Sequence, residues 1–246
     1  MGGAAAERPE GAVSGPAPIR LVVCGTDTDV GKTAVSAWLV QGLGAHYWKP
    51  VQSGLDGGGD CGRVKNLLRL PSSRLCPEAY RLREPVSPHW AAELEGVLIE
   101  PNRLTLPAVP GALVVETAGG LLVPLRRDWL QIDQLRQWNL PVVLVARSGL
   151  GTLNHTLLSL EALRRRQIPV LGLILNGAPH GDNPRTLVEL GGVPLIGHLP
   201  PLSPLSGDSL EAEWQRQRIA HRLEALIAAR PPGGWGCSDA GRPGDP

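Results

Sequence analysis

The chain has 246 residues, of which 42% are hydrophobic, and this length and composition suit one α/β domain with a proper core. Its 24 basic and 23 acidic side chains leave a net charge of +1, so it lacks the concentrated positive field that proteins bound to nucleic acids or membrane surfaces need. No apolar run approaches the roughly 18 residues that span a bilayer. The four cysteines show neither a C-x-x-C pair nor a zinc-ligand spacing, which indicates reduced thiols in a cytoplasmic protein.

The two ends of the chain are rich in glycine and proline, and we expect them to be disordered. They cover residues 1–18 and 231–246, which leaves a single expected domain of residues 19–230. Within it, short apolar runs predict buried strands at residues 20–25, 111–116, 141–146, 170–176 and 194–198. Helix-like spacing occurs at residues 31–43, 60–70, 87–95, 128–138, 152–167, 183–191 and 208–229.

This alternation of strands and helices predicts a doubly wound, mostly parallel α/β sheet with helices on both faces. Such sheets bind ligands outside the carboxyl ends of their strands. The loops that follow the strands are therefore where functional side chains are expected.

The first loop, 25-GTDTDVGKT-33, follows a strand and precedes an amphipathic segment, as a phosphate-binding loop does. Its first glycine lies one place earlier than in the common form G-x-x-x-x-G-K-[ST]. Lys32 would reach the β- and γ-phosphates and the Thr33 hydroxyl would bind Mg²⁺, whereas the alternative is a glycine turn that merely starts a helix. The polar run 26–29 indicates a second, polar substrate beside the γ-phosphate.

Polar residues also follow a second predicted strand. Lys49 lies at the carboxyl end of that strand, where it could stabilise a second anion, although a solvated surface charge is an equal alternative. A glycine-rich segment then brings Asp60 to the start of a helix. Asp60 is the better candidate for a Mg²⁺ ligand and Asp56 the fallback, with a plain helix cap as the competing interpretation.

Later loops add further candidates. Glu116 ends a fully apolar strand, where an ionised side chain is costly unless it is paired or binds a metal, so a metal or phosphate role is favoured. The loop 147–156 ends near a helix N-terminus and could hold an anion, while His155 within it is interpreted as structural. Asn176 could contact the edge of a base or cap the turn after its strand.

Taken together, these motifs resemble those of the dethiobiotin synthetases. GTDTDVGKT, KPVQSG, EPVSPHWAAELEG, VVETAGGLLVPL, GLGTLNHT and LILN occur in the order of that family, and the resemblance covers residues 19–228. The related partition and nitrogenase-iron-protein ATPases carry a lysine near the start of the phosphate loop, where this chain has Gly25-Thr26. The resemblance implies a P-loop NTPase fold.

The resemblance also implies a reaction. In that family 7,8-diaminononanoate, CO₂ and ATP give dethiobiotin, ADP and phosphate, through a carbamate and a carbamic–phosphoric anhydride. The family acts in biotin biosynthesis as an ATP-dependent cyclo-ligase with Mg²⁺. It works as a homodimer, with the substrate site at the interface.

The resemblance extends to individual positions. It implies catalytic roles for Lys49, Lys32 and Thr28, and Mg²⁺ ligands at Thr33, Asp60 and Glu116. Thr28 and Ser53 match substrate contacts, and the carboxylate tail of the diamine reaches the partner copy at the segment Gly151, Thr152, Leu153 and Asn154. Nucleotide contacts fall at Asp29, Val30, Gly31, Lys32, Thr33, Ala34, Asp60, Glu116, Thr117, Ala118, Gly119, Asn176, Pro200, Pro201 and Leu202.

One departure and two alternatives accompany this interpretation. The family usually has glycine where this chain has Thr117, which adds a side chain close to the nucleotide. A cobyrinate amidase-type synthetase is one alternative, but its usual glutaminase domain has no room in 246 residues. A regulatory P-loop ATPase is the other, and it would have no use for Lys49.

Overall fold

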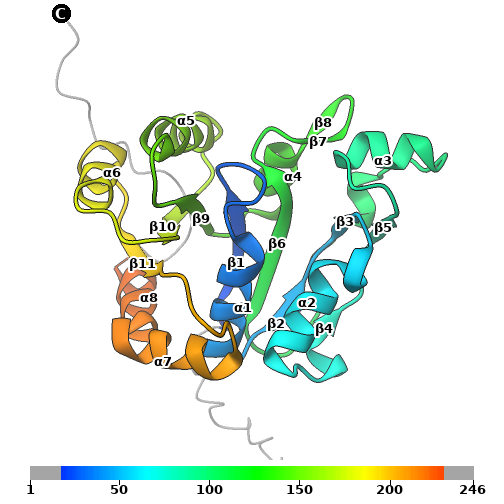
Figure 1. The fold of residues 1–246 in the computed structure, drawn as a ribbon. Coiled ribbons are helices and arrows are strands. Elements are labelled where there is room, and N and C mark those ends of the chain that lie inside the picture. The colour runs from blue at the N-terminus through cyan, green and yellow to red at the C-terminus, as the bar shows by residue number, and fades with distance from the viewer. Residues whose placement is uncertain (1–17, 230–246) are drawn as a thin grey trace, which may run out of the picture.

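A computed structural model provides the structure of the protein and describes residues 18–229 (Figure 1). The expected disordered ends lie outside these residues, apart from position 18. Seven strands form the main sheet of the described range in the order β11-β10-β9-β1-β6-β2-β4, and every pair is parallel. In chain order they are β1 (Arg20–Gly25), β2 (His46–Trp48), β4 (Leu75–Cys76), β6 (Leu113–Gly120), β9 (Val142–Arg147), β10 (Val170–Asn176) and β11 (Leu195–Leu199).

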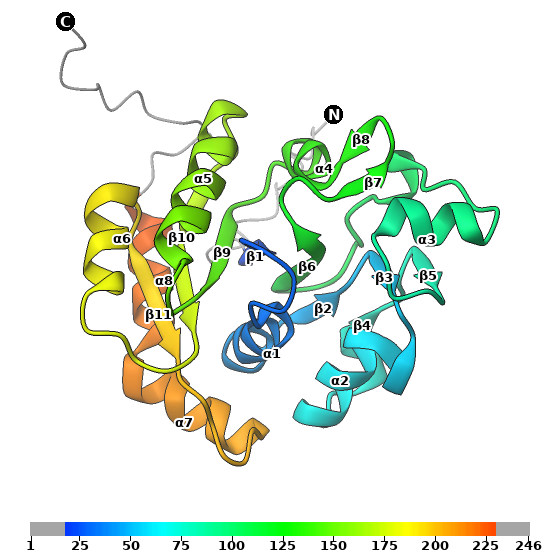
Figure 2. The ribbon, with the colours of Figure 1, turned by 45° about the horizontal axis from the view of Figure 1, so that its top comes forward.

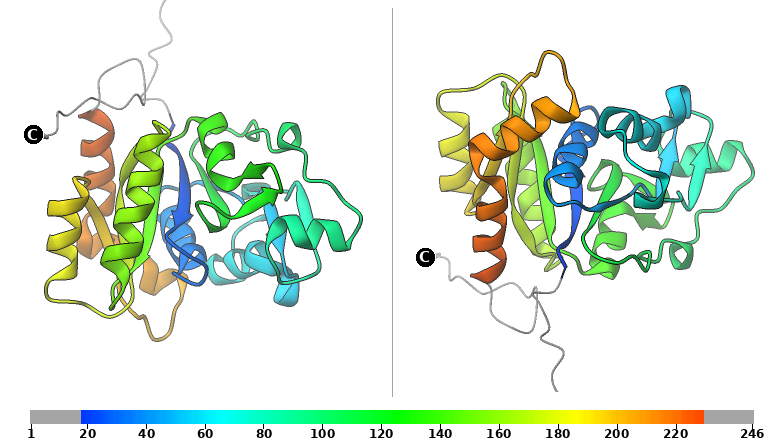
Figure 3. Two further views of the ribbon diagram at one scale, coloured as in Figure 1. Left: turned by 90° about the horizontal axis from the view of Figure 1, so that it is seen from above. Right: turned by 90° about the horizontal axis from the view of Figure 1, so that it is seen from below.

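Helices cover both faces of this sheet (Figure 3). One face carries α1 (Lys32–Gly42), α2 (Gly59–Leu68), α7 (Gly207–Gln217) and α8 (Ile219–Ala228). The other carries α3 (Pro88–Leu94), α4 (Gln131–Trp138), α5 (Thr152–Arg165) and α6 (Asn183–Gly191). Along β1, Leu21 and Val23 pack into the first layer whereas Val22 and Cys24 pack into the second, because strand side chains alternate between faces. The predicted doubly wound α/β fold is confirmed.

Short elements lie beside the main sheet, and the sequence did not predict them. β3 (Val51–Ser53) pairs with β5 (Tyr80–Leu82), and β7 (Pro124–Arg126) pairs with β8 (Trp129–Leu130). Single 3-10 turns are η1 (Asp56–Gly58), η2 (Ser72–Arg74) and η3 (Pro101–Arg103). Strands of two or three residues are too short to show a period. No helix within residues 18–229 has the length and apolar character needed to cross a membrane.

Residues 208–229 do not form the single helix that their spacing predicts. The chain breaks at Arg218, whose φ of 53° is left-handed, and α7 and α8 follow one another at an angle. The Gln217 side chain accepts a hydrogen bond from the backbone N–H of His198 at 2.9 Å and donates one to the carbonyl of the same residue. This attachment to β11 ends α7, so a tertiary contact overrides the local helical preference.

Candidate active site

The loop between β1 and α1 lies near the middle of the molecule, with α5 and α6 on one side and α2 and α3 on the other (Figure 2). Gly31 caps α1 with a left-handed φ of 92°. A Cβ at this position would collide with the Asn176 side chain, so only glycine fits here. The Asn176 amide donates a hydrogen bond to the carbonyl of Val30 at 3.2 Å. The end of β10 therefore supports the phosphate-binding loop.

Lys32, the first residue of α1, is only 7% exposed. Its ammonium donates a hydrogen bond to the carbonyl of Asp27 at 2.8 Å, so the side chain folds back over the loop. Burial lowers the pKa of Lys32, and the positive charge of Lys49 lowers it further. An anion bound against this loop would offset that electrostatic cost.

Glu116 on β6 is completely buried and accepts hydrogen bonds from three side chains. Its Oε1 accepts from the Thr33 hydroxyl at 2.9 Å and from the Lys49 ammonium at 3.0 Å. Its Oε2 accepts from the Tyr47 hydroxyl at 2.9 Å. Burial and the charge of Glu116 raise the pKa of Tyr47 well above its usual value, so the hydroxyl stays protonated and acts as the hydrogen-bond donor. These three donors compensate the cost of the buried charge.

Lys49 lies between two carboxylates and is 4% exposed. Its Nζ is 2.8 Å from Oδ2 of Asp60 and 3.0 Å from Oε1 of Glu116. Burial alone would lower the pKa of Lys49, but the two carboxylates outweigh burial and raise it. The same ammonium lowers the pKa of Asp60 despite the burial of that carboxyl. The alternative of a solvated surface lysine is therefore wrong.

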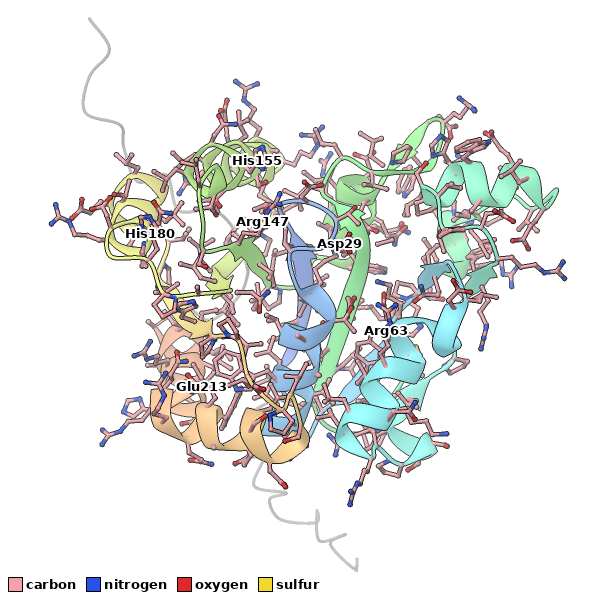
Figure 4. All side chains as sticks on the ribbon, viewed as in Figure 1. Asp29, Arg63, Arg147, His155, His180 and Glu213 are labelled. Atoms are coloured by element: carbon pink, nitrogen blue, oxygen red, sulfur yellow. The ribbon has the colours of Figure 1, made fainter. Side chains whose placement is uncertain are left out.

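One pocket of about 690 Å³, a volume in the range of small-molecule sites, is lined in part by Lys32, Thr33, Lys49, Asp60 and Glu116. Asp29 reaches it from the loop before α1 and Arg63 from α2 (Figure 4). The pocket brings together the following predicted residues: Thr28, Asp29, Gly31, Lys32, Thr33, Lys49, Ser53, Asp60, Glu116, Ala118 and Gly119. The Ser53 hydroxyl oxygen is buried and has no hydrogen-bond partner within residues 18–229, so it is free for a ligand.

The sequence of this chain is similar to those of a known protein family. A family model described as an AAA domain matches residues 20–209. An ATP-dependent dethiobiotin synthetase of Rhodopseudomonas palustris (strain BisB18) is 53% identical over 196 residues, covering 80% of this chain and 94% of that protein. One from Afipia carboxidovorans is 52% identical, covering 79% and 93%. The chain belongs to the ATP-dependent dethiobiotin synthetase family. This membership sets aside the amidase-type synthetase and the regulatory ATPase.

Solved structures show the same fold at much greater sequence distance. A chain of the MinC:MinD cell division protein complex from Aquifex aeolicus aligns with a TM-score of 0.52 at 12% identity. The alignment covers 87% of this chain and 98% of that one. At this identity the likeness shows the P-loop NTPase fold and nothing more specific.

Other predicted residues of this dethiobiotin synthetase family member do not line the pocket. Val30 belongs to the phosphate-binding loop, Ala34 lies in the first turn of α1, and Asn176 donates a hydrogen bond to the carbonyl of Val30. Pro200, Pro201 and Leu202 follow β11, beyond the end of the strand. Gly151, Thr152, Leu153 and Asn154 form the start of α5, and His155, also on α5, is exposed (Figure 4).

Thr117, the departure from the family pattern, faces away from the pocket. Its side chain is 1% exposed, and its hydroxyl donates a hydrogen bond to the carbonyl of Val23 on β1 at 3.3 Å. The Cys24 thiol lies against it, and burial raises the pKa of Cys24 to about 12. The added side chain thus contacts β1 and does not line the pocket, and its expected closeness to the nucleotide stays a prediction.

Tyr47, Gln52 and Arg63 are among the site residues that the sequence analysis missed. Gln52 is 6% exposed and accepts a hydrogen bond from the backbone N–H of Asp60 at 3.0 Å. It also donates to the carbonyl of Gly54 at 2.9 Å. Gln52 is part of the motif KPVQSG, but its role depends on how the following loop folds. Tyr47 can be recognised as a site residue only when β2 is known to pair with β6.

The oxygen atoms around Lys49 suit a magnesium ion. Within residues 18–229 no group of three or more His, Cys, Asp or Glu side chains could hold a metal ion by itself. However, Mg²⁺ usually takes one or two carboxylates and completes its shell with substrate phosphates and water. Glu116, Asp60 and the Thr33 hydroxyl offer such a set, and the Lys49 ammonium offsets one of the two negative charges of its carboxylates. The residues present fit a magnesium–nucleotide complex.

Proposed function

We propose that this protein converts 7,8-diaminononanoate, CO₂ and ATP into dethiobiotin, ADP and phosphate, with Mg²⁺. The observation that carries the proposal is the pairing of two buried ammonium groups, Lys32 and Lys49, in one pocket behind a phosphate-binding loop. A phosphate needs one cation and a second substrate anion needs another. The names of the relatives, ATP-dependent dethiobiotin synthetases, support the same activity.

The chemistry requires two anions to be held together. One amine of the substrate combines with CO₂ to give a carbamate and releases a proton. A carbamate oxygen attacks the γ-phosphorus, and the bond from phosphorus to ADP breaks. The second amine then attacks the carbonyl carbon, loses a proton and expels phosphate as the ureido ring closes. Because phosphoryl transfer depends on positioning and charge stabilisation, the carbamate must lie against the γ-phosphate.

We assign the residues as follows. Lys32 holds the phosphates, Lys49 offsets the charge of the carbamate and γ-phosphate, and Thr28 and Ser53 orient the diamine or carbamate. Thr33, Asp60 and Glu116 would hold Mg²⁺, which when bound offsets charge on the phosphate oxygens. The remaining ATP contacts are assigned to Asp29, Val30, Gly31, Ala34, Thr117, Ala118, Gly119, Asn176, Pro200, Pro201 and Leu202. Of this set, Thr117 contributes through its backbone, because its side chain faces the sheet.

A homodimer belongs to the proposal. Gly151–Asn154 do not line the pocket of their own chain, so any contact with the diamine would come from a second copy. A cytoplasmic location completes the proposal.

The test is product analysis by mass spectrometry. Purified protein receives 7,8-diaminononanoate, ¹³C-bicarbonate, Mg²⁺ and ATP, and a matched reaction omits the diamine. Dethiobiotin carrying one ¹³C, with ADP formed in step and only in the complete reaction, is expected. ATP that binds without being consumed would mean that the second substrate has been assigned wrongly.

A further inference from the structure

The two carboxylate oxygens of Glu116 face different partners. Oε1 faces the pocket side, where the Thr33 hydroxyl and the Lys49 ammonium donate to it. Oε2 accepts from Tyr47, the single donor to that atom within residues 18–229. Within residues 18–229 no residue of the phosphate-binding loop donates a hydrogen bond to this second oxygen, so its donor comes from a different part of the fold.

Strand pairing explains how a tyrosine reaches this position. Tyr47 on β2 lies opposite Val114 on β6. Side chains alternate along each strand, so Tyr47, Val114 and Glu116 point to the face covered by α1. The neighbouring Trp48 packs into the opposite layer. The tyrosine can therefore reach Glu116, two residues beyond Val114, and its hydroxyl lies 2.9 Å from Oε2.

Burial makes this hydrogen bond hard to replace. Tyr47 and Glu116 are both 0% exposed, so no bulk water reaches either group. A buried carboxylate oxygen that loses its donor carries the desolvation penalty uncompensated. Rotation about the last torsion of a glutamate side chain is broad and roughly two-fold, so the carboxylate could turn to share its remaining donors between both oxygens.

We propose that Tyr47 is a positioning residue, whose hydroxyl holds the Glu116 carboxylate in the orientation that presents Oε1 to Thr33 and to the metal–nucleotide complex. The proposal rests on the proposed function, because it takes Glu116 as a magnesium ligand. Tyr47 itself touches neither the pocket nor the substrates. Its effect on the reaction passes entirely through Glu116.

The test compares Tyr47→Phe with Tyr80→Phe, which changes the only other tyrosine of the chain. Tyr80 is 4% exposed and its hydroxyl accepts a hydrogen bond from the backbone N–H of Glu100 at 2.8 Å, outside the pocket. Each change removes one buried hydroxyl and leaves the ring. Binding of Mn²⁺ in the presence of ADP is followed by the electron paramagnetic resonance signal of free Mn²⁺, and ADP binding is measured without metal.

Tyr47→Phe is expected to weaken Mn²⁺ binding about 10- to 100-fold, the usual loss when the partner of a metal ligand is removed. ADP binding without metal should stay within about twofold, and Tyr80→Phe should bind Mn²⁺ like the wild type. Mn²⁺ binding unchanged in Tyr47→Phe, even with a lower melting temperature, would reduce Tyr47 to core packing and overturn the proposal. If the wild type itself binds no Mn²⁺ with ADP, the metal assignment of the proposed function fails, and this inference fails with it.

A second measurement does not depend on the folding of Tyr47→Phe. Wild-type protein made with fluorotyrosine has two fluorine resonances, which Tyr80→Phe assigns. Adding Mg²⁺ to the ADP complex should shift the Tyr47 resonance and leave the Tyr80 resonance in place. A Tyr47 resonance that does not respond to the metal would contradict the coupling through Glu116.

Discussion

At the scale of single residues, Lys32 and Lys49 are both buried ammonium groups, yet their surroundings move their pKa values in opposite directions. Burial dominates at Lys32 and lowers its pKa. At Lys49 the charges of Glu116 and Asp60 outweigh burial and raise the pKa. Within residues 18–229 no carboxylate forms a salt bridge with Lys32, which leaves its charge available for the proposed phosphate contact, whereas Lys49 is already held by two carboxylates.

The lowered pKa of Lys32 gives a pH-dependent prediction. A lysine whose pKa in the folded state lies below its unfolded value of about 10.4 lowers stability at neutral pH. This penalty disappears as the pH rises from the folded-state pKa to the unfolded-state pKa. Lys32→Met should therefore be at least as stable as the wild type near pH 7. The difference between their free energies of unfolding should shrink toward pH 10. Its kcat should fall about 10²- to 10³-fold. Denaturant unfolding at several pH values checks the sign, and a variant less stable than wild type at pH 7 would contradict it.

Lys49→Ala should lower stability as well as activity. The change leaves Glu116 and Asp60 as neighbouring carboxylates without their cation, which costs about 3–5 kcal/mol for a buried pair. Mg²⁺ should recover part of this loss, so the melting temperature of the variant should rise more with Mg²⁺ than that of the wild type. The exposed Lys65→Ala is the control. A melting temperature that changes neither with the substitution nor with Mg²⁺ would argue against the buried ion pairs.

Thr117→Gly restores the residue usual in the family. Because the Thr117 side chain lies inside the sheet, the change should leave the KM for ATP within about twofold. Stability should fall by about 1–2 kcal/mol, from the lost hydrogen bond to Val23 and the added freedom of glycine in a strand. Steady-state kinetics and chemical denaturation measure the two effects. A large change in KM without a loss of stability would show that the side chain reaches the nucleotide.

At the scale of elements, the loop from β3 to α2 determines which of its two aspartates pairs with Lys49. Gln52 spans this loop, because it holds the turn at Gly54 and the backbone N–H of Asp60 together. Gly59 lies so close to Gln52 that a Cβ there would collide with it. The side chain of Asp60 is thereby directed toward Lys49, whereas Asp56 stays exposed at the rim of the pocket.

Asp60→Asn and Asp56→Asn form a matched pair for this element. Asp60→Asn should raise the Mg²⁺ concentration required for half-maximal rate about 10- to 100-fold, because the amide loses the charge that favours the metal. Asp56→Asn should change it by less than about twofold. Initial rates titrated with Mg²⁺ at fixed ATP give both values. The reverse order of effects would move the ligand to Asp56.

At the scale of the whole molecule, the proposed homodimer places each active site across two chains. If the phosphate-binding loop of one copy works with the Gly151–Asn154 segment of the other, two inactive variants should complement each other. Mixed subunits of Lys49→Ala and Asn154→Ala would form hybrid dimers with one intact site each. Random mixing should restore roughly one quarter of wild-type activity. No recovery, with hybrid dimers present by native mass spectrometry, would place each site within one chain.

The sequence by itself determined the parallel α/β fold and most of the residues that meet in the pocket. Fully buried parallel strands are continuous apolar runs, and the phosphate-binding loop is a local motif whose strand, glycine, lysine and helix lie within a few residues of one another. Such features are encoded by neighbours in the chain. The same locality let Lys49, Asp60 and Glu116 be recognised as strand-end or helix-start positions.

Only the tertiary structure decided which way side chains face and what they touch. Tyr47 reaches Glu116 because β2 pairs with β6, and Thr117 turns into the sheet because β6 pairs with β1. The break at Arg218 follows from the contact of its neighbour Gln217 with β11. Each of these depends on pairing between segments far apart in the sequence. Periodicity and propensity describe a segment by itself, so they carry no information about such partners.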